Sequence, residues 1–302
     1  MQILKELAAK NGPLCVGLDT DPSYIPEALL KNYSSPAEAV LAYNKEIISR
    51  IKRDQSACCF KVQIAYYEAM GLEGMKVYSE TLRLVKESGL VCISDIKRGD
   101  IAATAGAYAR AHFSGDFESD IITINPYMGF DTLEPFTKYC EEKGKGIFVL
   151  LRTSNPGMVD IEQKNLAEGG RVLDAVGGHL KQLGEKFAPM FDGSETSPVG
   201  AVVGCTEESD AKLLRESYPD VFFLIPGYGA QGGAARICAR LLQKAGGTVN
   251  SSRGILCAWK KPPDCIKKGE EGTLTMADIA DAAAQAALDS KADLENACKL
   301  LQ

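Results

Sequence analysis

Charged residues gather in one short stretch of the sequence, LVCISDIKRGDIAAT (residues 90–104). An apolar run typical of a buried strand ends there in two carboxylates and two cations, Asp95, Lys97, Arg98 and Asp100. Side chains alternate along a strand, so we expect Asp95 and Lys97 on the same face. A lysine held beside a carboxylate at a strand end is suited to donate a proton.

Two more charged residues end earlier apolar runs. Asp19 follows LCVGL, and Lys61 lies near the end of ACCFKV. With Asp95 and Lys97 they would form a row that neutralises itself, and buried charges persist only when they are paired. Solvent exposure alone would explain any one of these four residues, since loops at strand ends are usually polar. That explanation is weaker for the four together.

A second chemical signal is the glycine-rich segment IPGYGAQGG (residues 225–233). Glycines let backbone N–H groups approach an anion closely, and the start of a following helix over 234–242 favours negative charge. Gln231 adds an amide donor, and Arg253 offers a guanidinium fork that suits phosphate. An ordinary turn also explains such a run. The glycines concerned are Gly227, Gly229, Gly232 and Gly233.

The elements that must position these residues alternate along the chain. Apolar runs predict strands at 14–18, 57–62, 90–94, 119–124, 146–151, 198–203 and 221–225. An eighth strand is either GTVNS (247–251) or ILCAW (255–259). Amphipathic stretches between the strands predict helices, among them 36–53, 74–88, 131–143 and 208–217.

This alternation implies parallel strands with crossover helices. Seven or eight such units in 302 residues predict one (β/α)₈ TIM barrel, a single domain over 1–302. A doubly wound sheet is less favoured, because no G-x-G-x-x-G follows the first strand. The connection over 157–197 is long and is expected to carry its own helix at 171–187. In a barrel the carboxyl ends of the strands share one mouth, so the polar strand ends would converge there.

Composition limits the classes of function. The chain has a net charge of −6, which argues weakly against nucleic acid as a partner. Two histidines and ten cysteines without a C-x-x-C pair make a metal site unexpected. No apolar stretch reaches 18 residues and no signal-like segment opens the chain, so we expect a soluble cytoplasmic protein with no membrane partner.

The motifs together resemble the long form of the orotidine 5'-phosphate decarboxylase family. They occur over roughly residues 13 to 258, almost the whole chain. D-x-K-x-x-D followed by I-x-x-T is specific in this context, whereas GLD alone is not. The matching segments, in order, are GLDTDP, FKVQ, SDIKRGDIAAT, NPYMG, RTSNPG, PGYGAQGG and SSRG. The resemblance also favours GTVNS as the eighth strand, because it places Arg253 just beyond it.

The resemblance implies a homodimer with shared active sites and no metal or organic cofactor. It implies decarboxylation of orotidine 5'-monophosphate to uridine 5'-monophosphate and CO₂, the last step of UMP biosynthesis, with Lys97 as proton donor. Lys61, Asp95 and Lys97 would be the catalytic residues of one subunit, and Asp100 would complete the partner's site.

Substrate-binding residues are implied in the same way. Thr104 would reach the partner's site with Asp100, Asp19 would hold the ribose, and Ser154 would contact the pyrimidine. Gln63 and Asn125 fall near the sugar. The phosphate would be held by Gln231, Gly232 and Arg253.

Alternatives remain at this stage. A Mg²⁺-dependent sugar-phosphate decarboxylase on the same barrel shares D-x-K-x-x-D, and a non-catalytic nucleotide-binding module is possible by fold analogy. For Asp100 the competing role is a helix N-cap, a common use of Asp before a helical segment such as 101–111.

Overall fold

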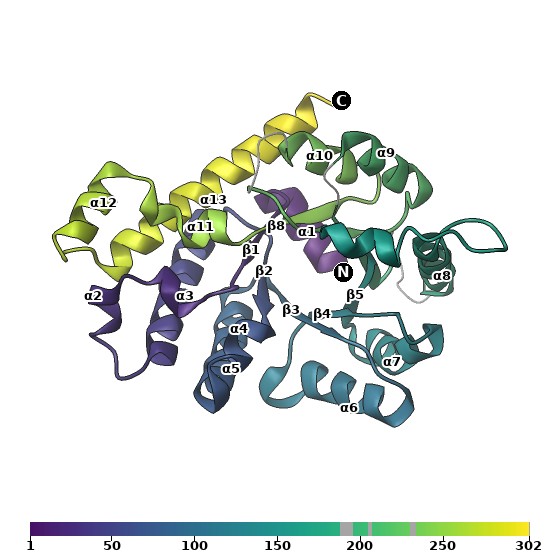
Figure 1. Ribbon diagram of the computed structural model, residues 1–302, viewed down its shortest axis with the longest axis horizontal. Coiled ribbons are helices and arrows are strands. Elements are labelled where there is room, and N and C mark those ends of the chain that lie inside the picture. Colours follow the sequence, from purple (N-terminus) through teal and green to yellow (C-terminus); the bar gives the residue numbers. More distant parts are fainter. Residues whose placement is uncertain (188–195, 205–206, 230–233, 302) are drawn as a thin grey trace.

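Eight parallel strands close into a barrel in the computed structural model, which describes residues 1–187, 196–204, 207–229 and 234–301 (Figure 1). Each strand pairs with the next along the chain, and the eighth pairs with the first. The strands are β1 (Leu14–Gly17), β2 (Cys59–Gln63), β3 (Val91–Arg98), β4 (Ile121–Ile124), β5 (Gly146–Arg152), β6 (Val199–Val203), β7 (Phe223–Ile225) and β8 (Gly247–Ser251). The predicted (β/α)₈ barrel is confirmed.

Helices surround this barrel. The α-helices of the described chain are α1 (Gln2–Asn11), α2 (Glu27–Leu30), α3 (Pro36–Asp54), α4 (Ile64–Glu68), α5 (Gly71–Ser88), α6 (Ala102–Phe113), α7 (Glu134–Lys143), α8 (Val172–Phe187), α9 (Glu208–Ser217), α10 (Ala234–Leu241), α11 (Arg253–Leu256), α12 (Pro263–Glu270) and α13 (Met276–Lys299). Short 3₁₀ turns are η1 (Pro22–Tyr24), η2 (Gly115–Phe117), η3 (Phe130–Leu133), η4 (Pro156–Asp160) and η6 (Ala258–Lys260).

The predicted elements agree with these bounds within a few residues. The eighth strand is GTVNS, and ILCAW instead lies in α11 and η6. The helix expected at 131–143 begins later, because residues 130–133 form the 3₁₀ turn η3. Two helices at the ends of the chain, α1 and α13, were not predicted. The long α13 packs against α3 and α10 and completes the outer layer.

Local sequence explains where the outer helices begin and what they bury. Helix α3 starts at Pro36, after the Ser35 hydroxyl accepts a hydrogen bond from the Glu38 N–H. Its buried residues recur at helical spacing, for example Val40, Ile47 and Ile51, and face the strands. The strands are buried on both faces, as parallel strands covered by helices must be.

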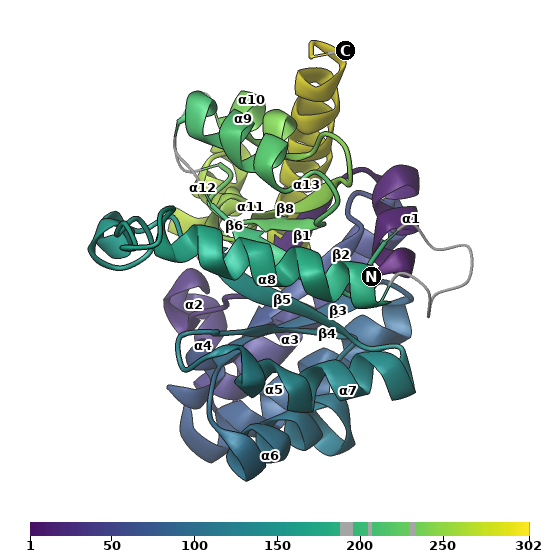
Figure 2. The same cartoon turned by 90° about the vertical axis from the view of Figure 1, so that its right-hand side faces the viewer.

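Two apolar layers result. The outer one lies between strands and helices, and the inner one fills the barrel. Helix α1 inserts Leu4 into the inner layer beside Cys15 and Cys59, which closes the end of the barrel where the strands begin. Figure 2 shows α1 at the right, opposite α2 and the segment that precedes α8. The mouth formed by the strand carboxyl ends is therefore the open end.

The long fifth connection carries the expected helix, α8. Before it come η4 and an isolated bridge between Asn165 and Arg171. This segment projects beyond the barrel wall in both views (Figures 1 and 2). Within the described residues no helix is both long enough and apolar enough to cross a membrane.

Candidate active site

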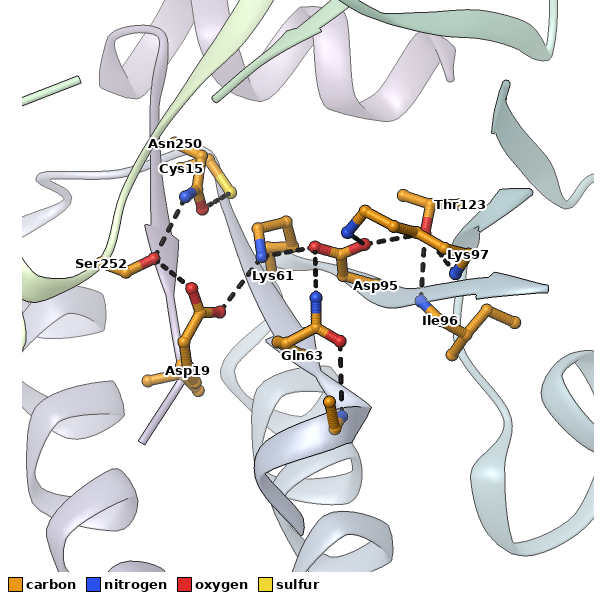
Figure 3. Close-up of polar contacts among 12 residues, drawn as sticks. Cys15, Asp19, Lys61, Gln63, Asp95, Ile96, Lys97, Thr123, Asn250 and Ser252 are labelled. Carbon is orange, nitrogen blue, oxygen red and sulfur yellow. Dashed lines mark hydrogen bonds and ion pairs between the residues drawn. The ribbon is translucent and has the colours of Figure 1, made fainter. Parts of the chain in front are cut away.

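Four charged side chains form a continuous row across the carboxyl ends of β1, β2 and β3 (Figure 3). The Lys61 ammonium lies 3.1 Å from Asp19 Oδ1 and 2.8 Å from Asp95 Oδ2. The Lys97 ammonium lies 2.6 Å from Asp95 Oδ1. The order is Asp19–Lys61–Asp95–Lys97, which we call the charge row. The predicted row is thus brought together.

The alternation of side chains along β2 and β3 places the buried middle of the row, Lys61 and Asp95. Lys61 and Asp95 follow Cys59 and Ile93 of the inner layer by two residues each, so they also point into the barrel. In the β2–β3 register Lys61 lies opposite Ile93 and Gln63 opposite Asp95, which sets the two charges one above the other near the mouth.

Burial and pairing oppose each other in the middle of the row. The side chains of Lys61 and Asp95 are only 6% and 7% exposed. Burial disfavours the charge on Asp95, but the attraction of Lys61 and Lys97 outweighs it and holds the pKa of Asp95 well below its ordinary value. Burial likewise disfavours charged Lys61, yet Asp95 and Asp19 keep its pKa above the ordinary value. Both groups therefore stay ionised near neutral pH.

Lys97 differs from the rest of the row in exposure and backbone. Its side chain is 44% exposed, so its ammonium faces the open mouth while it touches Asp95. Its φ is +45°, in the left-handed region that non-glycine residues rarely adopt. The β3–β4 register shifts between Ser94 and Arg98 at this point. Sequence alternation predicted the contact with Asp95 but not this bulge.

The other two charges of the opening stretch leave the row. Arg98 lies 2.5 Å from Glu68 of α4 and stacks on Tyr108. Asp100 is half-buried, and its carboxylate accepts a hydrogen bond from the adjacent Ile101 N–H. Ile101 itself is the N-cap of α6, with no side-chain cap bond, so the N-cap role considered for Asp100 is wrong. Thr104 lies exposed on the first turn of α6.

Uncharged residues that sequence reasoning missed support the row. The Ser252 hydroxyl donates to Asp19 Oδ2 at 2.7 Å and accepts from the Asn250 amide at 3.1 Å. A Cβ on Gly17 would lie 2.0 Å from Ser252 Oγ, so only glycine fits there. Ser252 belongs to the SSRG motif, which was a signal for it. The role of Asn250 at the end of β8 had no signal beyond its polarity.

Two further partners bind Asp95. The Gln63 amide donates to Asp95 Oδ2 at 3.1 Å, so in this structure Gln63 contacts the charge row. The family resemblance instead places it near the sugar. The Thr123 hydroxyl of β4 donates to Asp95 Oδ1 at 2.9 Å. Asp95 consequently receives hydrogen bonds from two lysines, an amide and a hydroxyl.

The end of β5 holds Ser154 in an exposed position. Glu162 accepts hydrogen bonds from the N–H and the hydroxyl of Thr153, at 3.0 and 2.7 Å. Arg152 donates to the Thr153 carbonyl and pairs with Asp210 of α9. The backbone just before Ser154 is therefore fixed on both sides, and Glu162 comes from the long connection.

The residues predicted to bind phosphate lie only partly within the described chain. Gln231 and Gly232 lie outside the described residues. Arg253 is exposed at the start of α11, two residues after the end of β8, and no described residue forms an ion pair with its guanidinium. Gly227 and Gly229 both adopt φ of +93°, which glycine tolerates.

Asn125 stands apart from the row. Its side-chain oxygen accepts from the Tyr127 N–H at 3.0 Å, a local turn after β4. The structure thus gives Asn125 a role in the backbone of the mouth and does not bring it to the other predicted residues. Among the described residues, no cluster of three or more His, Cys, Asp or Glu side chains could hold a metal ion.

A parallel (β/α)₈ barrel with a row of paired carboxylates and lysines at its mouth has the architecture of an enzyme. Residues 12–261 match the family described as "Orotidine 5'-phosphate decarboxylase / HUMPS family". The chain belongs to this family.

Individual relatives agree with that membership. The chain is 50% identical over 269 residues to the orotidine 5'-phosphate decarboxylase of Clostridium novyi, covering 89% of this chain and 92% of the relative. It is 51% identical over 256 residues to that of Clostridium tetani, covering 84% and 87%.

Solved structures extend the likeness to the fold. A putative orotidine 5'-phosphate decarboxylase from Streptomyces avermitilis is 27% identical with a TM-score of 0.76, covering 98% of this chain and 95% of that one. The UMP synthase of Leishmania donovani is 32% identical with a TM-score of 0.68, covering 89% of this chain and 55% of that one. The family suggested by the sequence motifs is confirmed.

Proposed function

We propose that this protein decarboxylates orotidine 5'-monophosphate to uridine 5'-monophosphate and CO₂, the last step of UMP biosynthesis. The observation that carries the proposal is the charge row, with an ammonium at its exposed end. Relatives about half identical over nearly the whole chain bear the same activity in their names, which supports it.

The proposed chemistry needs a group that stabilises a carbanion. When the bond between C6 and the carboxylate breaks, the electron pair stays on C6 and CO₂ leaves. Fixed charges already in place stabilise such a developing charge without reorganisation. Lys97 Nζ would lie beside C6 and then transfer a proton to it. The neutral lysine would regain a proton from water.

The neighbours of Lys97 support this role. The Asp95 carboxylate lies 2.6 Å from the Lys97 ammonium, close enough to hold it by a charge-assisted hydrogen bond. Asp95 is itself held by Lys61 and Gln63, so it orients Lys97 from a fixed place. In the proposed complex Asp95 would face the substrate carboxylate.

Substrate binding is proposed to use the rest of the mouth. Asp19 would hold the ribose, Ser154 the pyrimidine, and Arg253 the phosphate together with Gln231 and Gly232. Asn125 would line the sugar end. Because the phosphate is remote from C6, its binding energy would serve to close the site and exclude water.

A homodimer in the cytoplasm belongs to the same proposal. Asp100 and Thr104 would enter the partner's site. Support comes from their position on the rim at the start of α6, where neither contacts the charge row of its own chain.

One assay tests the proposed activity. Purified protein is mixed with orotidine 5'-monophosphate, and the ultraviolet absorbance of the substrate is followed with and without EDTA. We expect loss of substrate at the same rate in both. No loss would point to a nucleotide-binding module, and a reaction abolished by EDTA would favour a Mg²⁺-dependent decarboxylase.

A further inference from the structure

We infer that the hydroxyl of Thr123 is a positioning group that fixes both the Lys97 backbone and the Asp95 carboxylate in the geometry needed for proton transfer. The inference rests on the proposed function, and it assigns a role to a residue that none of the motifs above contains.

The hydroxyl of Thr123 is fully used. Thr123 lies on β4, completely buried, and its Oγ1 accepts hydrogen bonds from the N–H groups of Ile96 and Lys97, each at 3.0 Å. It donates to Asp95 Oδ1 at 2.9 Å (Figure 3). A hydroxyl has one proton to donate and two lone pairs. The proton and both lone pairs of the Thr123 hydroxyl are engaged, so the direction of the hydroxyl is fixed. Its partners are the Asp95 carboxylate and the backbone N–H groups of the next two residues.

The bulge in β3 explains why a side chain is needed there. Ser94 pairs with Ile122 and Arg98 with Ile124, so four steps along β3 correspond to two steps along β4. The amides inside this bulge lose their regular partners on the neighbouring strand, and a buried amide without a partner is costly. Thr123 Oγ1 accepts hydrogen bonds from two of these amides, those of Ile96 and of the proposed proton donor Lys97.

The same hydroxyl compensates for strain at the proton donor. A left-handed backbone at a non-glycine residue costs free energy and persists only where the surroundings hold it. Lys97 has a φ of +45°. With its N–H tied to Thr123 and its ammonium on Asp95, Lys97 is held at both ends. Loss of the hydroxyl would leave the charges present but free the backbone that aims them.

The barrel contains a matched control. Thr248 on β8 is also completely buried, and its hydroxyl donates to the Pro13 carbonyl at 2.9 Å. Its other neighbours are the thiols of Cys58 and Cys59, at the closed end of the barrel. Its hydrogen-bond partners among the residues that the structure describes include no charged side chain. A valine at either position keeps the shape and removes the hydroxyl, so the two variants separate positioning from general stability.

The experiment compares Thr123→Val, Thr123→Ser and Thr248→Val with wild type. For Thr123→Val we expect kcat to fall about 10- to 100-fold, as small misplacements of reacting groups do, with KM and the affinity for uridine 5'-monophosphate little changed. Thr123→Ser keeps the hydroxyl and should recover most of the rate. Thr248→Val should lower the melting temperature while leaving kcat at the wild-type value.

A second readout is independent of turnover. Amide hydrogen exchange of a peptide covering residues 95–98 should speed up in Thr123→Val and not in Thr248→Val. If Thr123→Val does not fold, Thr123→Cys replaces it, because a thiol is only a weak donor and acceptor. Unchanged kcat and unchanged exchange would overturn the inference, and a rise in KM alone would do the same. Wild-type protein inactive on orotidine 5'-monophosphate would instead refute the proposed function, which the exchange measurement does not depend on.

Discussion

The two halves of the barrel mouth differ in how their charged side chains are paired. At the ends of β1, β2 and β3 every charge of the row has a partner, and hydrogen bonds from Ser252, Gln63 and Thr123 fix the carboxylates. At the ends of β5 and β8, Ser154 is exposed and Arg253 has no ion pair with a described residue. In the first half the charges are paired with one another without substrate, whereas the second half leaves its cation available to a ligand.

This difference suits the proposed reaction. Groups that stabilise a developing carbanion contribute most when they need not move as the charge develops. Groups that bind the remote phosphate contribute by gaining contacts when substrate arrives. Damage to the first half should therefore lower kcat, and damage to the second should raise KM.

The largest expected effect is in the charge row. Lys97→Ala should lose at least about 10²-fold in kcat, the size typical of a positioned proton donor, while still binding uridine 5'-monophosphate. Lys97→Arg should also be poor, because a guanidinium keeps the charge but does not give up its proton. Steady-state rates and titration with the product test this, with exposed Lys76→Ala as control. A Lys97→Ala enzyme retaining more than about a hundredth of the wild-type rate would contradict the role of proton donor.

The next largest effect is expected in the second half of the mouth, at Arg253. Removing one partner of a charge-assisted hydrogen bond in a desolvated site costs on the order of 2–5 kcal/mol. Arg253→Ala should lower kcat/KM for the nucleotide accordingly, mostly through KM, and hardly change the feeble activity on the phosphate-free nucleoside. Lys261→Ala removes an exposed cation further along the same segment and should have little effect. Equal losses on nucleotide and nucleoside would mean that Arg253 serves the pyrimidine or the fold.

Much of the charge row was predictable because it depends on strand periodicity. Asp19, Lys61 and Asp95 end apolar runs, and parallel strands bring such ends together. The fixing of Lys97 was not predictable. Period-two alternation assumes regular pairing, but β3 and β4 shift register at this point and Lys97 is left-handed. The hydrogen bonds that Thr123 makes there join two strands, so no local pattern in β3 encodes them. Gln63 is placed by resemblance near the sugar, although in this structure it contacts Asp95.

The fold, like the site, was predictable where it depends on local periodicity and not where it depends on tertiary packing. Strand and helix periods predicted the barrel and, within a few residues, α3, α8 and α9. Helix α1 precedes the first strand, and α13 follows β8 only after α11, η6 and α12, so the short strand–helix alternation predicted neither of them. Leu4 fills the inner layer and α13 covers the gap between α3 and α10, which no local pattern encodes.

A subunit-mixing experiment tests whether the first half is complete within one chain. Asp100→Asn and Lys97→Ala chains should each be inactive alone. If Asp100 acts in the partner's site, a heterodimer has one site with both defects and one with neither. Random exchange then returns activity towards about a quarter of wild type. Activity of the mixture is measured after exchange has been verified with differently tagged chains, and wild type mixed with Lys97→Ala gives the reference. A mixture that stays inactive despite exchange would refute the shared site.

The smallest expected effect concerns the long connection. Glu162 accepts hydrogen bonds from the N–H and hydroxyl of Thr153, next to Ser154. It should therefore act only on the second half of the mouth, at the ends of β5 and β8. Glu162→Gln keeps the size of the side chain but weakens these charge-assisted bonds, and hydrogen bonds to charged groups are worth about 1.5–3 kcal/mol. Because Arg152 still holds the Thr153 carbonyl, we expect only part of this, a rise in KM of a few-fold with kcat nearly unchanged. Glu168→Gln, an exposed change on the same connection, is the matched control. A fall in kcat without a change in KM would show that the long connection acts on the charge row, and the separation between the two halves of the mouth would then be wrong.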